Sequence, residues 1–311
     1  MTTEPTTSDT QDRHTTLLVT VWAAYAVAAL LLLGIGELTL WAGIVLAAAA
    51  VLAVVPRLRP AVSAAVDRRD LLVIAVLYVA VVALFRVAFT VFGTDSVLGL
   101  FLCFAAGLLL GTVGPIAYQV WGRGADLHSL GLGRHNLALT VGLGLALAGV
   151  QFTMTLWGYP LPAPVDWVPL LVMSIVVGLF EAVFFRGFIQ GRLEASLGPV
   201  PAVAGAALLY AGYHVGYGMP LGEMWFLLGL GVVYAIVYRL TRNILILWPL
   251  LTPLGAFYNN LDAGDIALPW EAILGFADVA ALIALAVWLA HRRLRRSQQP
   301  TTPSATREAV Q

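Results

Sequence analysis

The feature that most constrains this chain is a series of long apolar runs separated by short polar segments. Runs of roughly 17–25 residues recur along the chain, and this is the length that an α-helix needs to cross a bilayer. The chain is 60% hydrophobic and only 11% charged, so it lacks the polar surface to cover a water-soluble domain of 311 residues. We therefore predict an all-α, polytopic membrane protein. Its spanning helices are expected at residues 17–35, 39–55, 71–93, 97–121, 137–156, 168–189, 200–218, 223–239, 243–258 and 270–290.

The distribution of arginine supports about ten transmembrane helices. The chain has no Lys, and all 17 basic residues are Arg. Arg residues occur in alternate loops, whereas the intervening loops contain acidic residues such as Glu37 and Asp95 and no Arg. Because positively charged loops remain in the cytoplasm, this alternation predicts that both termini are cytoplasmic. The Arg residues on the predicted cytoplasmic side are Arg57, Arg59, Arg68, Arg69, Arg123, Arg134, Arg192, Arg239, Arg242, Arg292, Arg293, Arg295 and Arg296.

Two charged residues, Glu181 and Arg186, lie inside the apolar run 168–189. A charge at the centre of a spanning helix costs about 2.5–3.5 kcal/mol on insertion scales, so it usually has a function. Five residues correspond to about 140° around an α-helix, so the two side chains are not expected to pair directly on one face. Arg186 would instead reach the cytoplasmic interface or brace a neighbouring helix, and the alternative interpretation of the two residues is a structural ion pair.

His214 is the one histidine expected within a span, and it shares a helix face with Tyr210, four residues earlier. The glycines and tyrosines around it favour a polar site, and a satisfied core histidine is the alternative. A catalytic zinc ion needs three protein ligands, and a single intramembrane His disfavours that. Cys103, the only cysteine, excludes a disulfide framework. No metal or other cofactor is predicted.

Pro249 and Pro253 lie four residues apart inside the apolar run 243–258. Proline removes a backbone donor and clashes with the preceding helical turn, so the pair predicts a broken or kinked helix. Irregular backbone at this depth is tolerated where it lines a cavity.

These motifs together resemble those of the CAAX-protease and bacteriocin-processing (CPBP, or Abi) intramembrane endopeptidases. The family pattern begins with two adjacent glutamates and an arginine, which correspond here to Glu181, Ala182 and Arg186. An aromatic residue and a histidine four residues later match Tyr210 and His214. The third motif, His-x-x-x-Asn/Asp, retains only its amide, at Asn259 or Asn260, since Gly255 and Ala256 stand where the histidine is expected.

The resemblance implies a catalytic set of Glu181, Arg186, His214 and Asn259. Glu181 would activate water as the general base, and His214 and Asn259 would orient the water or stabilise the oxyanion. Arg186 would position Glu181 or screen its charge. The implied substrate is a peptide bond in a membrane-associated or lipid-modified (CAAX-type) protein. The departures at Ala182 and Gly255 leave open a catalytically inactive relative that binds a membrane partner or confers immunity. A proton-coupled solute transporter that uses Glu181 and Asp278 is a third hypothesis.

The domain organisation follows from these assignments. We expect disordered tails at 1–16 and 297–311, accessory transmembrane helices at 17–156, a CPBP-like transmembrane core at 165–262 and a final helix with a basic flank at 270–296. The partners are the lipid bilayer and a membrane-associated protein substrate, and no nucleic acid is expected. Arg, Ala and Val in the absence of Lys are typical of a GC-rich bacterial genome, so a multi-pass protein of the bacterial plasma membrane is predicted. The sequence leaves the oligomeric state open.

Overall fold

The computed structural model describes residues 28, 40, 67–134, 136–264 and 268–297. All regular structure in these residues is helical, and none of it is β-strand. Within them, five helices are long and apolar enough to cross a membrane. These candidate spans are Arg68–Phe92, Val97–Gly122, Leu137–Thr155, Pro164–Leu197 and Gly222–Thr241. An all-helical membrane protein is confirmed to this extent.

The helices of the described part alternate between α-helix, 3-10 turns and wider π-helical segments. In chain order they are α3 (Arg68–Val87), η2 (Ala88–Phe92), α4 (Val97–Phe104), η3 (Ala105–Val113), α5 (Gly114–Ala117), η4 (Tyr118–Gly122), η5 (Leu127–Leu130), α6 (Leu137–Thr155), α7 (Pro164–Glu181), η6 (Ala182–Gln190), α8 (Gly191–Leu197), α9 (Pro199–Gly212), η7 (Tyr213–Tyr217), α10 (Leu221–Thr241), η8 (Ile244–Ile246), α11 (Leu251–Ala263) and α12 (Glu271–Ser297).

Most predicted spans coincide with these helices. The runs at 71–93, 97–121, 137–156, 168–189 and 223–239 each match one candidate span. The run at 200–218 is helical as α9 and η7, and the run at 270–290 lies within α12. The runs at 17–35 and 39–55 lie outside the described residues. The number of ten spans and the cytoplasmic position of both termini therefore stay predictions.

The predicted span 243–258 is not one helix. A short 3-10 turn, Ile244–Ile246, is followed by turns, and α11 begins only at Leu251. The break at the prolines was expected, but a continuous span was wrong because the helix that follows has only 13 residues. The indole Nε1 of Trp248, in the broken segment, donates a 2.9 Å hydrogen bond to the carbonyl oxygen of Ile175. This hydrogen bond fixes the segment between η8 and α11 against α7.

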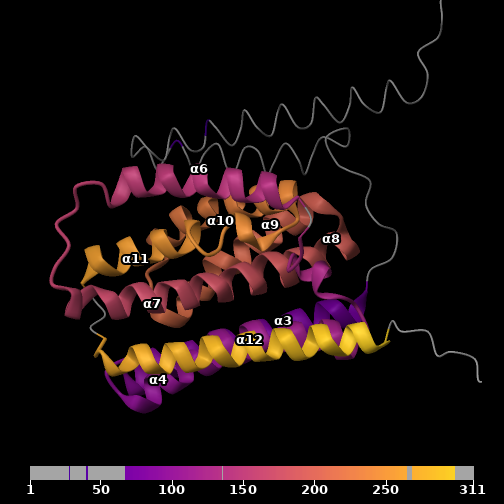
Figure 1. The fold of residues 1–311 in the computed structure, drawn as a ribbon, viewed down its shortest axis with the longest axis horizontal. Coiled ribbons are helices and arrows are strands. Elements are labelled where there is room, and N and C mark those ends of the chain that lie inside the picture. Colours follow the sequence, from indigo (N-terminus) through magenta and orange to yellow (C-terminus); the bar gives the residue numbers. More distant parts are fainter. Residues whose placement is uncertain (1–27, 29–39, 41–66, 135, 265–267, 298–311) are drawn as a thin grey trace, which may run out of the picture.

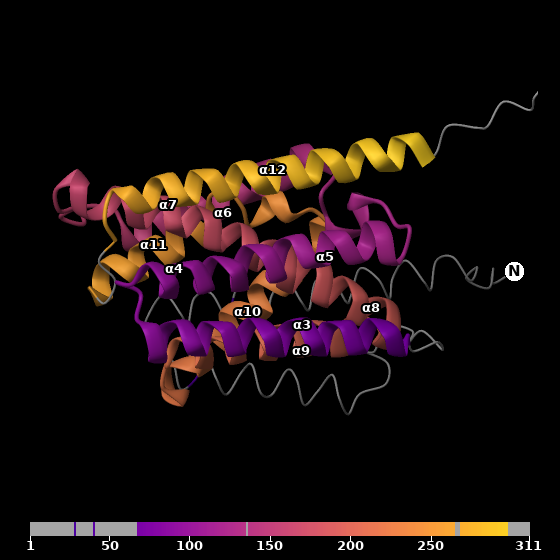
Figure 2. The ribbon, with the colours of Figure 1, turned by 90° about the horizontal axis from the view of Figure 1, so that it is seen from below.

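The helix α7 with its continuation is the central element of the bundle. In the most apolar 18-residue stretch of the candidate span Pro164–Leu197, 61% is buried inside the protein. The corresponding share for Leu137–Thr155 is 17%. The long helices lie roughly parallel, with α6 on one side, α3, α4 and α12 on the other and α7 between them (Figure 1). The view turned by 90° shows the same elongated arrangement (Figure 2). The centre of the molecule is thus the segment that carries Glu181 and Arg186.

Aromatic side chains from α7 and η6 fill this centre. Phe180, Phe184, Phe185 and Phe188 are all buried, and Phe180 stacks on Phe184 with ring centroids 5.7 Å apart.

Close packing of η6 against η5 depends on the glycine at position 187. A Cβ on Gly187 would lie 2.3 Å from the carbonyl oxygen of Leu130, so no other residue fits there without displacement.

The prediction that Glu181 and Arg186 do not pair directly agrees with the structure, in which no ion pair joins these two side chains. The segment η6, from Ala182 to Gln190, is π-helical, so the angle between the two residues differs from the 140° of a regular α-helix.

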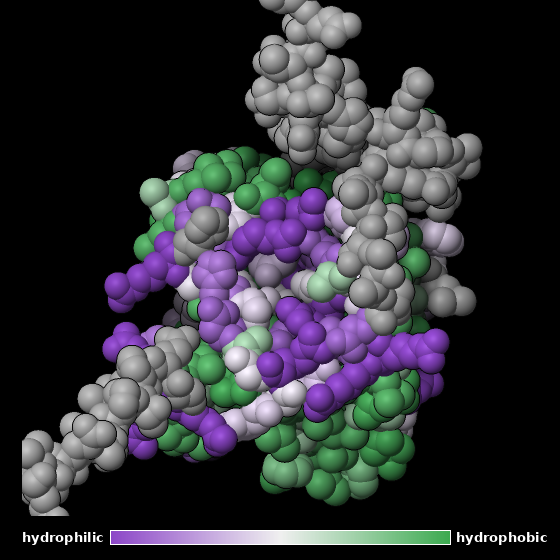
Figure 3. Space-filling view, turned by 90° about the vertical axis from the view of Figure 1, so that its right-hand side faces the viewer, coloured by the Kyte–Doolittle hydropathy of each residue, from purple (hydrophilic) through white to green (hydrophobic). Residues whose placement is uncertain are grey.

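The arginine-bearing loops of the described part meet at one end of the bundle. Arg123 contacts Asp67 closely and lies 3.2 Å from Asp70, and Arg192 lies 3.9 Å from the same Asp70. The hydrogen bond from Arg123 lowers the pKa of Asp67, as do those from backbone N–H groups. Viewed onto this end, hydrophilic side chains gather on the face and apolar side chains flank it (Figure 3). This is the arrangement expected of a bundle whose sides face lipid.

Candidate active site

Glu181 is the last residue of α7, and its side chain is buried. The hydroxyl of Tyr213 donates a hydrogen bond to its Oε1. Tyr213 lies where α9 ends at Gly212 and the chain continues as the 3-10 turn η7. A 3-10 turn winds more tightly than an α-helix, so it redirects the side chains that follow it. This change of helix type places the tyrosine hydroxyl at the carboxylate.

His214 follows Tyr213 in the same turn and is also buried. Its Nδ1 lies 3.0 Å from the backbone oxygen of Tyr210. Because a carbonyl oxygen only accepts, Nδ1 is the donor in this contact, and in the neutral ring Nε2 is then an acceptor. The ring centroids of His214 and Tyr213 are 4.1 Å apart. Glu181 and His214 therefore belong to one buried cluster and both contact Tyr213.

Arg186 is buried beside this cluster and interacts mainly with aromatic rings. Its Cζ lies 5.0 Å from the ring centroid of Tyr210 and 6.0 Å from that of Tyr234. Neither Nη1 nor Nη2 has a hydrogen-bond partner among the described residues. The two ring faces supply a cation–π attraction, and Glu181 lies near enough to interact with the charge electrostatically. The structure thus places Arg186 beside Glu181 without a direct ion pair between them.

Gly255, which stands where the family's third motif has a histidine, lies close to the hydroxyl group of Tyr234. A Cβ on Gly255 would lie 3.8 Å from the hydroxyl oxygen of Tyr234 and 3.8 Å from Nε2 of Gln151. These are ordinary van der Waals distances, so a side chain could begin there. Tyr234 also contacts the ring of Tyr210 at 6.1 Å, which links it to the cluster around Glu181. A hydroxyl group and an amide therefore border the space in front of Gly255.

Asn259 is not brought to the other three predicted site residues. It lies on α11 with an exposed side chain, about 6 Å further along the helix than Gly255. In the described part of the chain, no hydrogen bond or ion pair joins it to Glu181, Arg186 or His214. Thr252, the other polar residue near the third motif, is buried and donates to the carbonyl oxygen of Leu247 at 3.3 Å.

The position of the family's second glutamate, Ala182, is fully buried. Phe180, Val183 and Phe184 share its apolar surroundings, so the residue acts as part of the core. Over the residues described, no group of three or more His, Cys, Asp and Glu side chains is arranged to hold a metal ion. The chemically active groups of the cluster are a carboxylate, an imidazole, a guanidinium and tyrosine hydroxyls.

Tyr213 and Tyr234 were not among the site residues predicted from the sequence. Tyr213 stands directly before His214 and between two glycines, Gly212 and Gly216. That glycine spacing was a signal that the helix could change its winding there. Tyr234 lies in an ordinary apolar run, and nothing in its local sequence distinguishes it from a core tyrosine. Only the packing of α10 against η6 and α11 reveals its position.

Comparison with known proteins identifies one family. The family model for Rce1-like proteins, type II CAAX prenyl endopeptidases, matches residues 163–250. The match begins at α7 and ends just before α11, so it includes Glu181, Arg186 and His214 but not Asn259. Neither the curated proteins nor the solved structures gave a match. Over residues 163–250 the chain is therefore similar to the Rce1-like type II CAAX prenyl endopeptidases, and the resemblance to the CPBP family that its motifs indicated is confirmed.

Proposed function

We propose that this protein is an intramembrane endopeptidase that cleaves a peptide bond in a membrane-associated or lipid-modified, CAAX-type protein. The observation that carries the proposal is the buried Glu181 carboxylate, which Tyr213 holds beside His214 within the Rce1-like segment. A carboxylate that is held in place within hydrogen-bond reach of a water molecule can act as a general base. Nε2 of His214 supplies an acceptor that can orient this water.

The proposed reaction needs no metal ion. Glu181 takes a proton from water as the water oxygen attacks the scissile carbonyl carbon. The tetrahedral oxyanion then expels the amine, and Glu181 returns the proton to the leaving nitrogen. His214 orients the water, and Arg186 provides positive charge near the carboxylate. The hydroxyl of Tyr234 is the candidate donor to the oxyanion, and one such donor is worth on the order of 10²–10³ in rate. Asn259, which the family resemblance implied as a further donor, is exposed and takes no part in the proposed step.

The wider placement of the protein is part of the proposal. We propose about ten spanning helices with both termini in the cytoplasm, in the plasma membrane of a bacterium. Residues 165–262 form the catalytic core, with 17–156 as accessory helices and 270–296 as the final one. The arginine-rich end then faces the cytoplasm, so the substrate approaches the core from the cytoplasmic leaflet.

A catalytically inactive relative that binds a membrane partner is the second candidate. Ala182 and Gly255 favour it, because both positions lack the polar side chains of the family pattern. The buried, apolar surroundings of Ala182 further suit a structural role. In this account the same cluster would bind a partner without hydrolysing it.

A peptide-cleavage assay separates the two. The purified protein is reconstituted in liposomes and incubated with a prenylated CAAX-type peptide, and products are identified by mass spectrometry. Cleavage at one bond by wild type, and its loss in Glu181→Gln, is the expected result. The matched control is Glu223→Gln, the same change at an exposed residue of α10, which should cleave normally. Binding of the peptide without cleavage by wild type would favour the inactive relative.

A further inference from the structure

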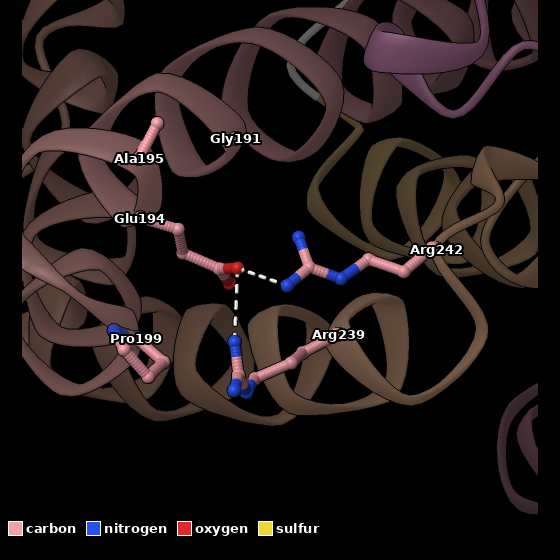
Figure 4. Close-up of a pocket in the computed structure, with 6 residues that line it drawn as sticks. All are labelled: Gly191, Glu194, Ala195, Pro199, Arg239 and Arg242. Carbon is pink, nitrogen blue, oxygen red and sulfur yellow. Dashed lines mark hydrogen bonds and ion pairs between the residues drawn. The ribbon is translucent and has the colours of Figure 1, made fainter. Parts of the chain in front are cut away.

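A second polar site lies at the arginine-rich end, away from Glu181. It is a cavity of about 320 Å³ at the meeting of α8, α9 and α10. We call it the arginine pocket, and it is lined by Gly191, Glu194, Ala195, Pro199, Arg239 and Arg242. Figure 4 shows the Glu194 carboxylate reached by both guanidinium groups.

The arginine pocket carries a surplus of positive charge. Nη1 of Arg239 lies 2.9 Å from Oε2 of Glu194, and Arg242 contacts the same oxygen closely. The other oxygen, Oε1, accepts a 3.0 Å hydrogen bond from Nε2 of Gln190. One carboxylate is therefore shared between two guanidinium groups, each with five N–H donors. Most of those donors remain available to a further acceptor.

The exposure of the three charged side chains shows which of them meets an incoming ligand. The side chain of Glu194 is only 6% exposed, whereas those of Arg239 and Arg242 are 38% and 43% exposed. The carboxylate thus lies behind the guanidinium groups and holds them in place. A molecule that enters the pocket meets positive charge first.

The pocket also has room for a headgroup-sized ligand. Gly191 and Ala195 contribute almost no side chain to its wall, and a Cβ on Gly191 would meet only the carbonyl oxygen of Ser129, at 3.6 Å. The site stands at the end of the candidate span Gly222–Thr241. Leu240, between the two arginines in sequence, is exposed and apolar. The pocket therefore lies where a spanning helix passes from lipid to the interface.

We propose that the arginine pocket binds a phosphate group, supplied by the headgroup of an anionic phospholipid or by free phosphate. Arginine forks match the geometry of phosphate oxygens, and basic pockets between spanning helices are a recurrent site for anionic headgroups. The simpler explanation is that Glu194 and its partners only clip α8 to α10. The two accounts predict opposite effects of removing the carboxylate charge.

The test measures lipid and phosphate binding by the full chain in detergent. Native mass spectrometry records how much phosphatidylglycerol the protein retains from an equal mixture with phosphatidylcholine of the same acyl chains. In lipid-free detergent, inorganic phosphate is titrated while the thermal unfolding midpoint is followed. The variants are Arg239→Gln with Arg242→Gln, the single Arg242→Gln and Glu194→Gln. The control is Arg295→Gln, which removes one exposed charge in the last turn of α12.

We expect wild type to retain phosphatidylglycerol in preference to phosphatidylcholine. The double arginine variant should lose about tenfold or more of that preference, since each arginine contributes about 1 kcal/mol near an anionic headgroup. Arg242→Gln should lose part of it, and the control should stay within about twofold. Glu194→Gln should raise retention by about fivefold, because it removes a competing negative charge.

Each possible result of these binding measurements either supports or overturns the proposed phosphate site. Phosphate stabilisation without a lipid preference, lost in the arginine variants, supports the phosphate site and assigns free phosphate as its source. Equal retention by wild type and both arginine variants, together with no phosphate stabilisation that these variants lose, overturns the proposal. A loss in the control as large as in the variants also overturns it, since general surface charge then explains the binding. A lower unfolding midpoint in Glu194→Gln with no gain in lipid or phosphate binding also overturns the proposal, since the carboxylate then only joins α8 to α10.

Discussion

The hydroxyl of Tyr213 donates a hydrogen bond to Oε1 of Glu181, so the candidate base is held by a residue next to the candidate histidine. Tyr213 thereby connects α7 to the turn η7. Tyr213→Phe removes the hydroxyl and keeps the ring that packs on Phe185 at 4.9 Å. Since a hydrogen bond to a charged group is worth about 1.5–3 kcal/mol, we expect kcat for peptide cleavage to fall roughly tenfold or more with little change in KM.

The control for this prediction is Tyr159→Phe, the same change in a tyrosine that packs edge-on against Tyr258 near the start of α7. It should leave kcat unchanged. If Tyr213→Phe cleaved as fast as wild type, the hydrogen bond to Glu181 would have no part in the reaction.

Adding or removing a hydrogen-bond donor beside Gly255 tests whether groups at this position stabilise the oxyanion. Tyr234→Phe takes away the hydroxyl that borders this space, and we expect a loss of about 10²-fold in kcat. Gly255→His places an imidazole there, and we expect cleavage to become faster. Initial rates with the same prenylated peptide measure both. A Tyr234→Phe variant with full activity would show that another group stabilises the oxyanion.

Two glycine substitutions should differ in their effect on stability. A Cβ on Gly187 would lie 2.3 Å from the backbone oxygen of Leu130, and backbone cannot easily move. A Cβ on Gly255 has no neighbour closer than 3.8 Å. Gly187→Ala should therefore lower the free energy of unfolding by about 1–3 kcal/mol, and Gly255→Ala should change it little. Unfolding in mixed micelles measures both, and equal effects would contradict the packing of η6 against η5.

The ion pair between Arg123 and Asp67 predicts that the thermal stability of the protein falls at acidic pH. The pKa of Asp67 lies below its ordinary value of 3.8, chiefly because Arg123 donates a hydrogen bond to the carboxylate. A carboxyl whose pKa is lower in the folded state stabilises the fold above its unfolded pKa, and this contribution disappears as the pH falls through the folded pKa. We expect wild type to lose more thermal stability below about pH 3.8 than Asp67→Asn does.

The measurement for this ion pair is the unfolding midpoint in detergent across the acidic range. Arg123→Gln removes the main donor and should show a profile between those of wild type and Asp67→Asn, because backbone N–H groups still bond to the carboxylate. Parallel profiles for wild type and both variants would mean that the contact contributes nothing to the fold.

The apolar runs were sufficient to predict the long helices of the described part. Their length depends on bilayer thickness, which acts on the chain whatever its tertiary contacts. The run 243–258 was the exception. Its composition suits a span, but the prolines divide it and Trp248 bonds to α7 instead of continuing a helix. The orientation that the arginine alternation predicts stays a prediction.

The details of the candidate site depended on tertiary packing. Arg186 lies in the π-helical segment η6 with its guanidinium group over the rings of Tyr210 and Tyr234, and no residue pattern predicts this placement. The pairing of Tyr213 with Glu181 joins residues 32 positions apart in the chain. Glu181 and His214 could be identified from their types and spacing, whereas the tyrosines that connect them could not. The catalytic roles of all these residues stay predictions.

The most direct test of the proposed function is the rate of peptide cleavage by Glu181→Gln, measured in liposomes beside wild type and Glu223→Gln. Glutamine keeps the size of the side chain and can still accept the hydrogen bond from Tyr213, but it cannot take a proton from water. We predict normal cleavage by wild type and Glu223→Gln, and a loss of at least about 10³-fold in Glu181→Gln. Cleavage by Glu181→Gln at the wild-type rate would contradict the assignment of Glu181 as the base.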